Sequence, residues 1–92
     1  MARQTMKDFY AWKSATIKAH GGLEKTDTSM MDEYSRYTKY YHLADGTIII
    51  EENGPAYIDI QTELGTMKQV KVFRSECYTS KDGTSHIFYE LY

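Results

Sequence analysis

Apolar residues recur with a helical period near the N-terminus and with an alternating period afterwards. Over residues 6–20 they fall on one face at about 100° per residue. That face carries Met6, Phe9, Tyr10 and Ile17, with Trp12 at its edge. Lys7, Ser14 and Lys18 lie on the opposite face. The pattern therefore predicts an amphipathic helix with one buried side.

Both ends of this helix carry sequence signals. Thr5 and Asp8 have the spacing of a capping box, and Gly21-Gly22 is suited to end a helix because glycine readily adopts positive φ. Lys13 falls inside the apolar arc, so its ammonium group must reach the rim or meet an acidic side chain. Residues 21–33 are polar without a clear period and predict a connection, with room for a short helix at 29–32.

The strongest strand signal is a hairpin at residues 34–53, where Asp45-Gly46 separates a tyrosine-rich run from Ile48-Ile49-Ile50. Asp-Gly favours a two-residue type I′ turn. With that turn, Leu43 pairs with Ile48, and Tyr41 pairs with Ile50, on the side that faces the core. The other side of the hairpin then carries Tyr40, His42, Ile49 and Glu51.

Alternation and turn residues predict three further strands, at 56–62, 67–79 and 85–92. The turns between them fall at 53–55, 63–66 and Asp82-Gly83. Both faces of the last pair are apolar: Ile87, Tyr89 and Leu91 form one row, and Phe73, Cys77, Phe88 and Tyr92 form the other. Because all connections are short, the strands should be antiparallel. The sequence predicts an α+β fold, with one N-terminal helix packed on a four- to five-stranded antiparallel β-meander at residues 34–92.

Length and charge narrow the classes of protein to consider. Ninety-two residues suit one domain, spanning residues 1–92. The formal net charge is −2, and no cluster of Lys or Arg is present, which argues against binding to duplex DNA. No apolar run is long enough for a membrane span or a signal peptide, so a cytoplasmic protein without a membrane partner is expected. Cys77 is the one cysteine, which precludes an internal disulfide.

Catalytic chemistry has one weak candidate. Cys77 and His86 lie diagonally adjacent on one face in the predicted register, as a thiol and its base would. No third orienting group or oxyanion hole accompanies them, and a small buried cysteine beside a histidine near a turn explains the pair better. The three histidines lack metal-ligand spacing, and no phosphate-binding loop is present. The sequence therefore predicts a protein that is not an enzyme and that needs no metal or cofactor.

Tyrosine is the unusual feature, with nine of 92 residues. Between Lys39 and Lys68 the chain has no Lys or Arg but five acidic residues. Tyrosine is enriched in binding surfaces, although it also populates strands for its β-propensity. We therefore expect a small protein-binding module that uses an acidic, tyrosine-rich sheet face against a basic partner surface. The candidate binding residues are Trp12, Tyr40, His42, Ile49, Glu51, Tyr57 and Asp59.

An inhibitor or adaptor fits this description. A phage-type inhibitor of a host defence nuclease, of the anti-CRISPR kind, is one example of the class and rests on no motif. Two alternatives remain open. One is a homodimer through Phe73, Phe88 and Tyr92. The other is a single-stranded nucleic-acid binder that stacks bases on exposed tyrosines, against which the net negative charge argues.

Overall fold

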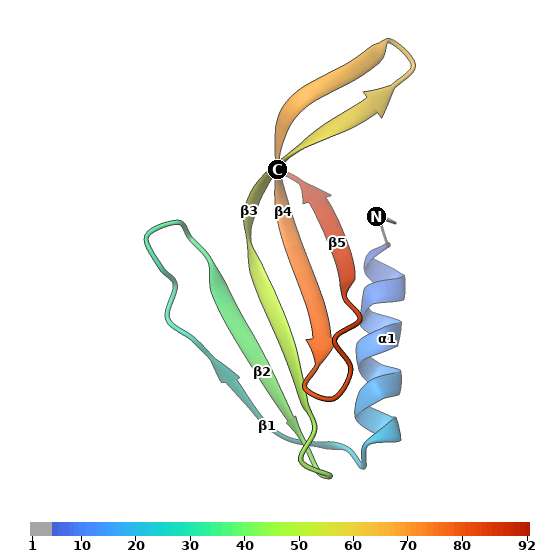
Figure 1. Ribbon diagram of the computed structural model, residues 1–92, viewed down its shortest axis with the longest axis vertical. Coiled ribbons are helices and arrows are strands. Elements are labelled where there is room, and N and C mark those ends of the chain that lie inside the picture. The colour runs from blue at the N-terminus through green and yellow to red at the C-terminus, as the bar shows by residue number, and fades with distance from the viewer. Residues whose placement is uncertain (1–4) are drawn as a thin grey trace.

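One helix covers one face of a five-stranded antiparallel sheet, as the computed structural model of residues 5–92 shows (Figure 1). The elements are α1 (Met6–Ala19), β1 (Leu23–Thr28), β2 (Tyr37–Leu43), β3 (Ile48–Thr62), β4 (Gly65–Thr79) and β5 (His86–Leu91). The strands lie in chain order from β1 to β5, so the sheet is a meander. The predicted α+β fold is confirmed. No helix of the described residues has the length and apolar content to cross a membrane.

Helix α1 begins and ends where the sequence signals place it. The Asp8 amide donates to Thr5 Oγ1 at 3.2 Å, and the Thr5 hydroxyl donates to Asp8 Oδ2 at 2.8 Å. These bonds satisfy groups at the helix start that have no partner within the helix. At the other end Gly21 and Gly22 have φ of +90° and +105°, which other residues rarely adopt. The Gly22 amide donates to the Ile17 carbonyl at 2.9 Å and closes the helix.

The predicted connection at residues 21–33 contains a strand instead. β1 pairs with β2 along the edge of the sheet, and every one of its side chains is exposed. Since neither face of this edge strand is buried, its sequence carries no hydrophobic alternation. The short helix for which the sequence left room at 29–32 does not form. Asp32 Oδ1 instead accepts the Tyr34 and Arg36 amides, at 2.8 and 3.0 Å, in a turn that leads into β2.

The hairpin between β2 and β3 is displaced by one residue from the predicted register. The Gly46 amide donates to the Leu43 carbonyl at 3.1 Å, the Leu43 amide donates to the Thr47 carbonyl at 2.9 Å, and Gly46 has φ of +90°. Ser35 and Gln69 are the non-glycine residues of the described chain with positive φ, so Asp45 cannot form a type I′ turn. The loop is the longer kind, in which a glycine follows a turn and forms a bulge.

This one-residue difference reverses the two faces of β3. Tyr41 pairs with Ile49, and Tyr40 pairs with Ile50. A shift of one residue moves every side chain of a strand to the other face. Ile49 therefore lies under α1 and is 0% exposed. Ile48 and Ile50, which the sequence assigned to the core, lie on the opposite face.

The hairpin between β4 and β5 also differs in register, by two residues. Glu76 pairs with Ile87 and Arg74 with Tyr89, where the Asp82-Gly83 turn predicted Tyr78 with Ile87. A shift of two residues leaves the faces unchanged because side chains alternate with period two. Phe73, Cys77 and Phe88 consequently share one face as predicted, and α1 covers that face. Cys77 and Phe88 belong to the buried core with Phe9, Leu43 and Ile49.

The predicted turn at residues 53–55 does not form, and β3 runs through it for 15 residues. β2 stops pairing with β3 at Asn53, so Pro55 lies where β3 has lost that neighbour. Proline is tolerated at such an edge because its missing N–H is not needed there. Gly54 is required for another reason. A Cβ at this position would lie 2.6 Å from Cγ of Arg36, which crosses β3 at that point.

Beyond this point β3 and β4 form a two-stranded arm, which we define as residues 56–71. β4 stops pairing with β5 at Val72, so the strands of the arm pair with one another alone. Figure 1 shows the arm projecting past α1 and the other strands, and the molecule measures 48 × 29 × 19 Å. The chain turns at Glu63-Leu64, as predicted, and Gly65 there has φ of +125°.

Candidate functional site

The seven predicted binding residues fall in four separate places. Tyr40 and His42 lie on the face of the sheet that α1 leaves open. Tyr57 and Asp59 lie on the arm and are exposed. Ile49 and Glu51 lie beneath α1, because the register prediction placed them on the wrong face. Trp12 lies at the rim of the core, with its ring centroid 4.3 Å from that of His86. The structure therefore gathers only part of the predicted set on exposed surfaces.

Beneath α1, Glu51 is the centre of a buried polar network. Lys13 Nζ lies 2.6 Å from Glu51 Oε1, so the lysine in the apolar arc meets an acid, which is one of the two alternatives that the sequence left open. The same oxygen accepts the Tyr41 hydroxyl at 3.3 Å and the Cys77 thiol at 3.6 Å. Glu51 Oε2 accepts the Asn53 amide group at 2.9 Å. Burial alone would raise the pKa of Glu51, but the hydrogen bonds from Lys13 and Asn53 and the lysine charge hold it below its ordinary value.

A cleft of about 360 Å³ opens between α1 and the sheet beside this network. Phe9, Lys13, Tyr41 and Glu51 form part of its wall. Lys13 Nζ lies 4.9 Å from the ring centroid of Phe9 and 5.0 Å from that of Tyr10, distances typical of cation–π contacts. Lys13 and Glu51 are thus engaged with one another and with the aromatic wall. Among the described residues, no group of three His, Cys, Asp or Glu side chains could hold a metal ion.

Cys77 and His86 pair directly across β4 and β5, closer than the predicted diagonal. Burial, followed by the neighbouring Glu51 carboxylate, raises the pKa of the Cys77 thiol well above its ordinary value. A thiol in this state is a poor nucleophile because the thiolate is the reactive form.

We expect Cys77 to resist Ellman's reagent in the folded protein, since its side chain is fully buried and its thiol is protonated at neutral pH. The rate of thiol modification should be negligible in native buffer. It should become fast in a denaturant that unfolds the chain. Rapid modification of one thiol per chain in native buffer would contradict this placement.

On the open face of the sheet, three acidic side chains each lie beside a hydrogen-bond or ion-pair partner. His42 Nε2 lies 2.8 Å from Asp27 Oδ2. The Tyr78 hydroxyl donates to Glu52 Oε2 at 2.9 Å. Arg74 Nη2 lies 2.7 Å from Glu76 Oε1. Each of these three acids has a donor beside it, so the excess of acid seen in the sequence does not appear as a bare acidic face. Ile48, Ile50 and Tyr40 lie between these pairs.

The arm carries the most exposed large apolar side chain of the described residues, together with two other exposed ones. Leu64 at its tip is 100% exposed, and Tyr57 and Met67 are also exposed. Ile58, Ile60 and Val70 are half-buried on the same ribbon. Asp59 Oδ1 accepts the Gln69 amide at 3.0 Å where the ladder is irregular, and Gln69 there has φ of +52°. An isolated two-stranded ribbon is at best marginally stable in water. The arm is thus a surface that lacks a cover within the described chain.

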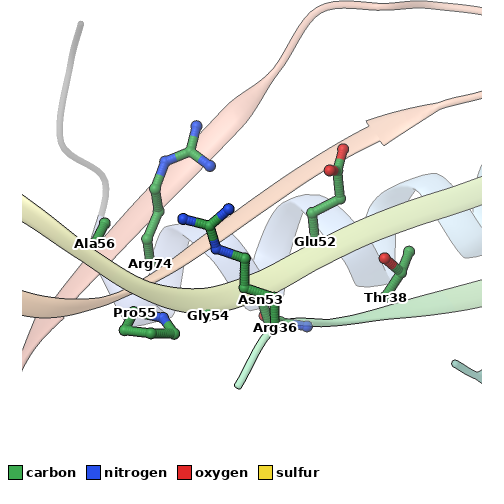
Figure 2. A pocket seen from close by; sticks show the side chains of 8 residues that line it. All are labelled: Arg36, Thr38, Glu52, Asn53, Gly54, Pro55, Ala56 and Arg74. Carbon is green, nitrogen blue, oxygen red and sulfur yellow. The ribbon is translucent and has the colours of Figure 1, made fainter. Parts of the chain in front are cut away.

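A second cleft, of about 310 Å³, lies on the open face where the arm leaves the sheet. Figure 2 shows Arg36 and Arg74 on its wall, with both guanidinium groups on the same side of β3 and Glu52 further along. Arg36 comes from the segment before β2, and Arg74 comes from β4 opposite Gly54. No sequence pattern linked these two arginines, which are 38 positions apart. The exposure of Leu64 could have been predicted from the sequence, because a leucine in a tight turn between two strands cannot pack into the core.

The homodimer face expected from the sequence is largely covered. Phe88 belongs to the core, with its ring centroid 6.0 Å from that of Phe9 on α1. Phe73 is half-buried and lines the cleft under α1. Tyr92 is exposed, and Lys71 Nζ lies 4.9 Å from its ring centroid.

Comparison of the chain with protein-family models, with curated proteins and with solved structures finds no match. The fold and the surfaces described above therefore carry the functional argument.

Proposed function

We propose that this protein is a small, non-catalytic protein-binding module, which engages its partner through the arm and the adjoining open face of the sheet. The observation that carries the proposal is the arm itself. It holds Tyr57, Leu64 and Met67 in solvent on a ribbon that nothing in the described chain supports. Exposed apolar groups that are brought together on a projecting element are typical of interaction sites.

The form of the arm suits an inhibitor or an adaptor. A narrow ribbon with an apolar tip can enter a groove on a larger protein, where Leu64 would be fully desolvated and would act as an anchor. The arm also presents Asp59 and Glu63 to a basic partner surface. Lys68 Nζ lies 3.6 Å from Asp59 Oδ2, but both side chains are exposed and such a surface pair contributes little energy. A nuclease with a basic groove, such as a host defence nuclease blocked by a phage-type inhibitor, is the narrower form of this proposal.

Affinity purification with quantitative mass spectrometry tests the role of the arm. The Leu64→Ser/Met67→Ser variant should recover the partner at least about tenfold less well than the wild type, because it removes the exposed anchors. The variant should unfold at nearly the same denaturant concentration, since both side chains already face water.

Leu23→Ser/Met30→Ser is a matched control, since it removes two exposed apolar side chains outside the arm. It should leave recovery unchanged. Tyr40→Ala reports separately on the open face. Equal recovery by the wild type and the arm variant would refute the proposal. For the narrower form, the purified protein should slow the enzyme it captures, and the arm variant should not.

A further inference from the structure

We propose that the cleft at the base of the arm binds a carboxylate carried by an extended acidic segment of the partner polypeptide. This inference rests on the proposed function and names the chemistry that the partner must bring. Arg36 and Arg74 are the residues that would hold the carboxylate. Each guanidinium group presents a planar fork of N–H donors, which matches the two oxygens of a carboxylate.

Arg36 is held in place before any ligand arrives. Its amide donates to Asp32 Oδ1 at 3.0 Å, and its guanidinium carbon lies 5.8 Å from the ring centroid of Tyr34. Its side chain crosses β3 over Gly54, where a Cβ would lie 2.6 Å from Arg36 Cγ. Glycine at position 54 is therefore what permits this arginine to rest against the strand. A donor that is already positioned loses less conformational entropy on binding.

Among the described residues, no acidic side chain neutralises the charge of Arg36. Within residues 5–92, no carboxylate lies within 4.0 Å of its guanidinium group. Arg74 is paired with Glu76, and 2.7 Å separates Arg74 Nη2 from Glu76 Oε1. A guanidinium group has five N–H donors, which is more than this single contact uses. Figure 2 shows both groups on the same side of β3, so an incoming carboxylate can meet them together.

Local charge favours one carboxylate over a chain of phosphates. Glu52 lines the same cleft, and Glu76 lies beside Arg74. These acids would repel a polyanion, and the formal net charge of the protein is −2. Nucleic-acid binding relies on several basic groups that neutralise successive phosphates. The cleft offers two arginines for one anionic group.

The free edge of β3 favours a polypeptide as the carrier. β2 stops pairing with β3 at Asn53, which leaves the following residues without a strand on that side. An extended segment can add to such an edge through backbone hydrogen bonds. A segment that continued the line of β2 along the arm would bring its side chains to Arg36 and Arg74.

Two-dimensional ¹H–¹⁵N NMR of the whole chain tests this inference with defined probes. The probes are a blocked hexapeptide with one glutamate among five glutamines, a blocked hexaglutamine peptide and a twelve-residue oligothymidylate. The glutamate peptide should shift the side-chain Nε–H signals of Arg36 and Arg74 and the Gly54 amide signal, and hexaglutamine should not. Arg36→Gln should weaken binding of the glutamate peptide about tenfold, because charged hydrogen bonds are lost. Lys18→Gln makes the same charge change on the exposed face of α1 and should have no effect.

Three results would overturn the inference. They are equal shifts with both peptides, unchanged affinity in Arg36→Gln, and stronger shifts of the same signals with the oligothymidylate. Partner recovery separates this inference from the proposed function. If Leu64→Ser/Met67→Ser loses the partner and Arg36→Gln keeps it, the arm binds the partner and the carboxylate site is refuted. If both variants keep the partner, both proposals fail.

Discussion

Replacing Lys13 with methionine is expected to lower the free energy of unfolding by about 3 kcal/mol. The variant keeps most of the apolar stem but removes the ammonium group that lies 2.6 Å from Glu51. The carboxylate is then left buried and charged, with Tyr41, Asn53 and Cys77 as its remaining donors. Urea denaturation followed by circular dichroism measures the loss. Lys18→Met, on the exposed face of the same helix, should change stability by less than about 0.5 kcal/mol.

The effect of Lys13→Met should depend on pH in a defined direction. In the wild type the folded-state pKa of Glu51 is below its ordinary value, so this residue stabilises the fold above pH ~4.5 and the contribution is lost as pH falls through the folded-state pKa. Without Lys13, burial dominates and the folded-state pKa should lie above the ordinary value. Protonation then removes the buried charge, and the penalty of the variant should shrink between pH 7 and pH ~4. A penalty that stays constant or grows over this range would contradict the buried ion pair.

Replacing Ile49 with alanine is expected to cost about 3 kcal/mol, because the side chain is fully buried beneath α1 and its loss leaves a cavity. Ile50→Ala should cost about 1 kcal/mol, since its side chain is only half-buried on the open face. The two variants differ by one position in the same strand and make the same chemical change. Chemical denaturation of both therefore reports directly on which face of β3 enters the core. If Ile50→Ala lost as much stability as Ile49→Ala, or more, the result would contradict this placement and favour the type I′ register.

The sequence predicted those elements whose signals are local. The capping box and the paired glycines marked both ends of α1, and alternation identified the segments that form β2 to β5. Of the two alternatives that the sequence left open for Lys13, the structure shows the meeting with an acid, although the predicted register placed Glu51 on the opposite face. The apolar faces of β4 and β5 were grouped correctly despite the wrong pairing, because an error of two residues preserves the sides of a strand.

The failures have physical causes that a single sequence does not display. Asp-Gly is compatible with both a two-residue turn and a longer loop, and the difference of one residue decides whether Ile49 or Ile50 is buried. β1 is an exposed edge strand held by backbone pairing, so its side chains carry no periodic signal. Asn53-Gly54-Pro55 has the composition of a turn, yet Gly54 gives room to Arg36 from the segment before β2. Contacts between distant segments brought Arg36 and Arg74 together, and no local pattern encodes them.

The arm can change its reach without disturbing the core. Its two strands are the end of β3 and the start of β4. Its tip is a tight turn that lies far from α1 (Figure 1). Inserting two residues in each strand next to the turn would lengthen the arm by roughly 7 Å, because a strand rises about 3.3 Å per residue. Insertions of two residues keep every side chain on its original side, whereas insertions of one reverse the sides beyond that point. Related chains could therefore fit grooves of different depth by varying the arm in such steps, while the helix and the sheet beneath it stay the same.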